Sequence, residues 1–123
     1  MAKRRVLSVG QCEPDHAALV RFLTTHFDVE IVPVKLPAEA AEAMRKSRFD
    51  LALVNRKLDE DYSDGLEVVK ILKAEADLAA VPVMLISNHP EAHAEGARHG
   101  ALPGFGKLEY NAATIELLRP LLE

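Results

Sequence analysis

Short apolar runs of strand length recur along this chain and are separated by longer segments of mixed polarity. The runs at 51–54 and 83–86 are apolar throughout, as expected for strands of a parallel sheet that is covered on both faces. The run at 29–34 contains Pro33, which lacks an N–H group and therefore favours an edge strand. We expect five strands, at residues 6–9, 29–34, 51–54, 83–86 and 102–105.

Each of these runs is followed by a segment with helical spacing of apolar residues. Helices are predicted to begin near Pro14, Pro37 and Pro90, because proline suits a first helical turn. A further helix is expected from Gly65 to about residue 76, and Asn111 is a candidate cap for the last one, which Pro120 should end or kink. Five βα units in series predict an α/β fold with a doubly wound parallel sheet. Right-handed crossovers favour the flavodoxin-like strand order 2-1-3-4-5, in one domain spanning residues 1–123.

Composition excludes several classes of function. The net charge of −4 gives no reason to expect nucleic acid or an anionic membrane as a partner. No apolar run approaches the roughly 20 residues that span a membrane, and no signal-peptide core follows the basic N-terminus. The single cysteine, Cys12, cannot form an internal disulfide. We therefore expect a cytoplasmic protein.

In open parallel sheets the functional site lies at the carboxyl ends of the strands. The residues that follow the predicted strands are small or polar, which makes this edge the candidate site. They are Gly10, Gln11, Cys12, Asn55, Ser87 and Lys107.

Four segments around these positions resemble the receiver domains of two-component response regulators. Residues 49–55 are similar to the family's third strand, and residues 64–67 (Asp-Gly-Leu-Glu) to the start of its third helix. Residues 81–87 resemble the fourth strand with its terminal hydroxyl residue. Gly100-Ala101 followed by Lys107 resembles the approach to the family's lysine. The resemblance covers the whole chain and implies a role in signal transduction.

The departures from the family pattern remove the phosphorylation chemistry. Asn55 stands where the family has its phospho-acceptor aspartate, and an amide lacks the anionic oxygen that attacks phosphorus. Gln11, paired with Gly10 or with Cys12 according to register, stands where the family has two magnesium-binding acids. Without those acids Lys107 would repel a cation, and we expect it to pair with the nearby Glu13, or to bond Asn55 or a loop carbonyl. We therefore predict no metal and no cofactor.

The conformational switch of the family is also altered. Gly104 stands in place of the switch aromatic, and Phe105, one position later, is expected to face the other side of its strand. Leu108 replaces the proline after the lysine, and the loop from Asn55 to Gly65 is about two residues longer than usual. The face made by the fourth helix, the fifth strand and the fifth helix should therefore keep one conformation.

These features predict an atypical receiver domain, not an enzyme, that works without phosphorylation as a protein–protein docking module. Its partner would be a signalling protein, an output domain of a longer chain, or a second copy in a homodimer. The alternative is a sensor that binds a small anion in the vacated pocket near Ser87 and Lys107. We expect His89, His93 and His99 to form a solvated helix face and not a zinc site, and the acidic residues 59–61 to form a solvated loop. Larger side chains available for docking elsewhere are Phe22, Phe27 and Tyr62.

Overall fold

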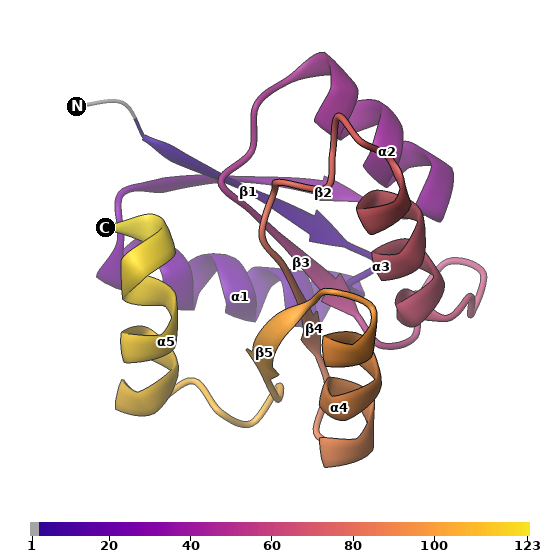
Figure 1. The fold of residues 1–123 in the computed structure, drawn as a ribbon. Helices are drawn as coiled ribbons and strands as arrows, with labels where there is room; N and C mark the ends of the chain where they lie inside the picture. Colours follow the sequence, from indigo (N-terminus) through magenta and orange to yellow (C-terminus); the bar gives the residue numbers. More distant parts are fainter. Residues whose placement is uncertain (1–2) are drawn as a thin grey trace.

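The computed structural model describes residues 3–123 as a five-stranded parallel sheet alternating with five helices (Figure 1). The strand order is β2-β1-β3-β4-β5, which confirms the predicted flavodoxin-like topology. In chain order the elements are β1 (Arg4–Val9), α1 (Glu13–His26), β2 (Val29–Val34), α2 (Pro37–Lys46), β3 (Leu51–Asn55), α3 (Gly65–Ala74), β4 (Val83–Ile86), α4 (Pro90–Arg98), β5 (Leu102–Phe105) and α5 (Ala112–Leu122).

Several local predictions are confirmed and two are corrected. Pro33 lies in the edge strand β2, and the Asn111 side chain caps α5 by accepting a hydrogen bond from the Thr114 N–H. α3 ends two residues before the predicted boundary, because the Lys73 ammonium donates to the carbonyls of Ala79 and Val81 and holds the chain in a turn there. α5 does not end at Pro120 but continues to Leu122.

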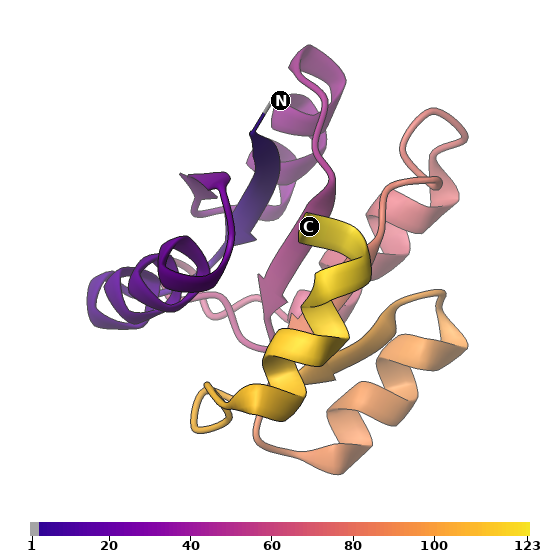
Figure 2. The same ribbon diagram turned by 90° about the vertical axis from the view of Figure 1, so that its left-hand side faces the viewer.

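Helices cover both faces of the sheet. α1 and α5 lie against one face, and α2, α3 and α4 lie against the other (Figures 1 and 2). Alternate residues of each strand enter the two cores, so that Val6 packs with α1 and α5 whereas Leu7 packs with α2 and α3. Every residue of β3 and β4 is buried, as their apolar sequences predict.

Phe22 of α1 and Phe27, which follows this helix, belong to the core and not to the surface. Phe22 and Phe27 are only 9% and 8% exposed, and the Phe22 ring stacks on Tyr110 at 4.7 Å between centroids. The expectation that these two rings are available for docking is therefore wrong. Tyr62, by contrast, is 72% exposed. Within residues 3–123, no helix is long and apolar enough to cross a membrane.

Candidate functional site

The residues predicted to form the site do gather at the carboxyl edge of the sheet. Gly10, Gln11 and Cys12 follow β1, and Asn55 is the last residue of β3. Ser87 follows β4, and Asn55 and Ser87 are both buried. A cavity of about 370 Å³ opens here, lined by Asn55, Arg56, Lys57, Ile86, Ser87, Asn88, His89 and Lys107.

The side chain of Asn55 forms a hydrogen bond to a backbone carbonyl. Its Nδ2 donates to the Gly10 carbonyl at 3.1 Å, inside the protein. An aspartate in this place would have two acceptor oxygens and no N–H for that carbonyl. The Asn55 side chain therefore ties β3 to the turn after β1.

Leu58 fills the space beside Gly10. Leu58 has no exposed surface, and a Cβ atom built on Gly10 would lie 2.3 Å from the Leu58 Cγ. Gly10 also has φ of 75°, a conformation that favours glycine. A larger side chain at position 10 is thus excluded both by the backbone conformation and by Leu58.

The loop between β3 and α3 puts Leu58 in this place. The Leu58 N–H donates to the Ser63 carbonyl, and the Asp59 N–H donates to the Gly10 carbonyl at 3.0 Å. A bridge between Lys57 and Asp64 closes the base of the loop. The extra length seen in the sequence therefore forms a folded turn that seals the β1 end. The sequence analysis missed Leu58, although an apolar residue in an acidic loop is a detectable signal.

Lys107 pairs with Asp15 of α1, at 2.5 Å between Nζ and Oδ2, and not with Glu13, Asn55 or a loop carbonyl. The prediction chose the wrong acid because α1 begins at Glu13, which points that side chain to solvent and brings Asp15 inward. The Lys107 ammonium lowers the pKa of Asp15, and a hydrogen bond with Cys12 lowers it further. Burial raises the pKa of Tyr110, with a smaller contribution from the Asp15 charge.

The remaining residues after β1 do not form a cation site. Cys12 is half-buried at the N-cap of α1, and Gln11 has a shielded Nε2 with no hydrogen-bond partner among the residues described. Residues 59–61 are exposed, as predicted for a solvated loop. In the part of the chain from residue 3 onward, no three acidic, histidine or cysteine side chains are grouped as a metal would require.

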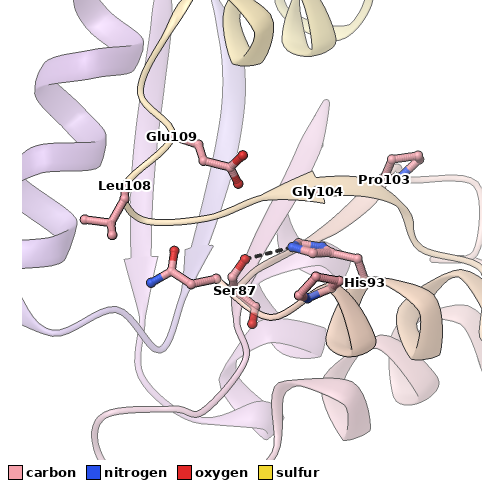
Figure 3. Close-up of a pocket in the computed structure, with 8 residues that line it drawn as sticks. Ser87, His93, Pro103, Gly104, Leu108 and Glu109 are labelled. Atoms are coloured by element: carbon pink, nitrogen blue, oxygen red, sulfur yellow. Dashed lines mark hydrogen bonds between the residues drawn. The ribbon is translucent and has the colours of Figure 1, made fainter.

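His93 packs beside β5 at Gly104. Its Nε2 donates to the Ser87 carbonyl at 2.8 Å, and its ring lies next to Gly104 (Figure 3). This ring is therefore part of the packing between α4 and β5, whereas His89 and His99 are exposed as predicted. Phe105 points the other way into the core under α5, which confirms its predicted orientation.

An irregularity in β5 explains why position 104 carries no side chain. The register pairs Met84 with Leu102 but Ile86 with Phe105, so β5 contains one more residue than β4 between these pairs. A Cβ on Gly104 would lie 2.0 Å from the Leu85 carbonyl oxygen. Beside it is a groove of about 580 Å³, lined by Ser87, Asn88, Pro90, His93, Pro103, Gly104, Leu108 and Glu109 (Figure 3).

Solved structures define the class of fold. The chain is similar to the chemotaxis response regulator CheY4 of Vibrio cholerae, with a TM-score of 0.78, 22% identity and coverage of 98% of this chain and 100% of that one. The signal receiver domain of a DNA-binding response regulator from Colwellia psychrerythraea gives 0.80 and 17%, with 96% and 97% covered. A response regulator receiver protein from Pseudomonas putida gives 0.79 and 18%, with 98% of each chain covered.

The chain therefore has the fold of response-regulator receiver domains, as the sequence motifs indicated. No protein-family model and no curated protein matches this sequence.

Proposed function

We propose that this protein is a receiver domain of a two-component signalling system that acts without phosphorylation, as a docking module for another protein. The observation that carries the proposal is the hydrogen bond from Asn55 to the Gly10 carbonyl, beneath the buried Leu58. This arrangement uses the nucleophile position for packing and fills the space of one metal-binding acid. It supports a domain that is held in a single state rather than switched.

The docking surface in this proposal is the groove between α4 and β5. Leu108 lies at its edge and is 88% exposed, more than any other large apolar residue among those described. His93 and Pro103 line the groove, and the backbone at Gly104 leaves it open. A shallow groove with one aliphatic anchor supports weak to moderate affinity, because tight interfaces depend on buried aromatic or arginine anchors. The partner is a signalling protein, an output domain or a second copy of this chain.

The domain, in this proposal, is not an enzyme, and it works in the cytoplasm. The Asn55 amide cannot form an acyl phosphate, and the Lys107 ammonium is paired with Asp15 and not free for a phosphoryl oxygen.

Incubation with acetyl phosphate and Mg²⁺, followed by intact mass measurement, tests the loss of phosphorylation. We expect no phosphoryl adduct on the native chain and none on Asn55→Asp, because Leu58 and the missing acids still prevent magnesium binding. The triple variant Asn55→Asp, Gly10→Asp and Leu58→Ala is a control for whether the pocket can be rebuilt. An acid-labile adduct on the native chain would overturn the proposal.

Docking is tested separately with Leu108→Ala, which lies on the surface and should not disturb folding. Sedimentation between about pH 5.5 and 8 measures self-association, since any histidine in the interface would titrate in that range. A decrease in association for Leu108→Ala, with none for the exposed Leu102→Ala, would support the groove as the contact. If both variants self-associated as strongly as the native chain, the groove would not be the contact of a homodimer.

The second candidate function is anion sensing at the strand ends. The 370 Å³ cavity there is lined by the cationic Arg56, Lys57 and Lys107 and by no acid. The Ser87 hydroxyl oxygen accepts a hydrogen bond from the His89 N–H, which leaves the hydroxyl proton for a ligand. A rise in melting temperature that scales with sulfate or phosphate concentration, and that disappears in Lys107→Met, would favour this function.

A further inference from the structure

A second cavity lies between α1 and the edge of the sheet, and of the residues predicted to form the strand-end site it shares only Gln11. It measures about 520 Å³ and is bounded by the first turns of α1 and the carboxyl ends of β1 and β2. None of Asn55, Ser87 or Lys107 lines it. We call it the α1–β2 cavity; its lining consists of Ser8, Gln11, Glu13, His16, Ala17, Pro33, Val34 and Lys35.

Small residues create this hollow. Ser8 of β1 is paired in register with Pro33 of β2, and Ala17 faces them from α1. Larger side chains at these positions would fill the space between helix and edge strand. The volume falls in the range typical of small-molecule sites, about 300–1,000 Å³.

One hydrogen-bond donor of the lining has no acceptor among residues 3–123, and the tautomer of His16 can supply a second. The Gln11 Nε2 is shielded from solvent and has no partner among residues 3–123. The Ser8 hydroxyl is fully buried, and its one hydrogen-bond neighbour among residues 3–123 is His16 Nδ1, at 3.3 Å. In the tautomer in which Nδ1 accepts from this hydroxyl, the His16 Nε2 carries an N–H that is available to a ligand. Leaving a buried donor such as Gln11 Nε2 unpaired is costly, so an acceptor is expected beside it.

Charge favours an anionic acceptor. Lys35 lies at the rim and forms no ion pair with any described residue, and the N-terminus of α1 adds partial positive charge. Glu13 has the opposite charge to Lys35 and is exposed at the rim. Ala17, Pro33 and Val34 provide an apolar wall that suits a short hydrocarbon chain.

We propose that the α1–β2 cavity binds a small organic carboxylate with a short apolar body. The carboxylate accepts hydrogen bonds from Gln11 and His16 and is attracted by Lys35, while the apolar body lies against Ala17, Pro33 and Val34. Gln11, which stands where the family has a metal-binding acid, thereby gains a role in a different pocket. This site is independent of phosphorylation and of docking at the α4–β5 groove.

Isovalerate is the probe, and its binding is measured by ¹H–¹⁵N NMR titration of the native chain. We expect millimolar affinity, with shifts at the Gln11 side-chain amide, His16 and Lys35. Gln11→Leu keeps the side-chain volume and should weaken binding about tenfold or more, as expected for a lost hydrogen bond to a charged group. Lys35→Met should weaken it about twofold to fivefold, the range for exposed charge pairs, whereas the control Lys46→Met should not.

The variant Glu13→Gln tests whether the bound ligand is an anion. Removal of the rim carboxylate should tighten isovalerate binding, and weaker binding would contradict the proposal. Isoamyl alcohol, a neutral molecule with a similar body, should bind more weakly than isovalerate. Equal binding of the alcohol, shifts confined to Ser87 and Lys107, or unchanged affinity in both Gln11→Leu and Lys35→Met would each overturn it. Because Lys35 is exposed, its variant remains informative even if Gln11→Leu folds poorly.

Discussion

Lys107, in the segment after β5, and Asp15 of α1 form an ion pair across the carboxyl edge of the sheet. Both side chains are about one-third exposed, so the pair is screened by solvent and contributes about 1 kcal/mol to stability. The contribution of the pair to the free energy of unfolding depends on pH in a direction that can be predicted.

We predict that Asp15→Asn lowers the free energy of unfolding at about pH 7 by about 1 kcal/mol. The pKa of Asp15 is lower in the folded than in the unfolded chain, mainly because of Lys107. The contribution of the pair is therefore present above the unfolded pKa and is lost as the pH falls through the folded pKa. Urea unfolding at several pH values should show the difference between variant and native chain vanishing near about pH 2.

Asp28→Asn is the matched control, since Asp28 is exposed and forms no ion pair within residues 3–123. It should change stability little at either pH. A double-mutant cycle with Lys107→Met separates the pair from the interaction of Asp15 with the start of α1. If the difference between Asp15→Asn and the native chain persisted at acid pH, this account of Asp15 would be wrong.

Among the elements, the loop between β3 and α3 carries the buried Leu58. We predict that Leu58→Ala destabilises the protein by about 2–5 kcal/mol, as for other buried leucines. Gly10→Ala should also destabilise it, because of the positive φ and the collision with Leu58. The double variant should lose less than the sum of the single losses, since removing Leu58 relieves the collision. Strict additivity in chemical denaturation would show that Leu58 does not press on Gly10.

The extra residue in β5 leads to a second prediction at this scale. Gly104→Ala should cost about 1–3 kcal/mol, because its Cβ would meet the Leu85 carbonyl and the His93 ring. Leu102→Ala on the same strand serves as the comparison, since Leu102 is 41% exposed and should cost less. Thermal unfolding of both variants tests this. An unchanged melting temperature for Gly104→Ala would mean that β5 adjusts freely.

The strands, helices and their order could be predicted because hydrophobic periodicity is a local property of the sequence. The strand order alone was enough to predict that Asn55, Ser87 and Lys107 lie at the same edge of the sheet. The partners of these residues could not be predicted, because they depend on three-dimensional packing. Asp15 is 92 residues from Lys107, and only the start of α1 determines which acid points inward. His93 was assigned to a solvated face because helical spacing does not show that β5 lacks a side chain beside it.

At the scale of the whole molecule, we expect these local features to hold one state, in line with the proposed function. The Asn55 amide donates to the Gly10 carbonyl, Leu58 packs against Gly10, and the His93 ring packs beside Gly104. We predict that Mg²⁺ with beryllofluoride, a phosphoryl mimic, leaves the ¹H–¹⁵N spectrum of the native chain unchanged. Relaxation dispersion should likewise show no exchange confined to α4 and β5, because a two-state face would broaden those resonances on the microsecond-to-millisecond timescale. His93→Ala is the informative variant, since it frees the Ser87 carbonyl and opens the space beside Gly104. Exchange that appears in α4 and β5 only in this variant would identify the His93 contact as what holds the face in place, whereas exchange in the native chain would contradict the single-state account.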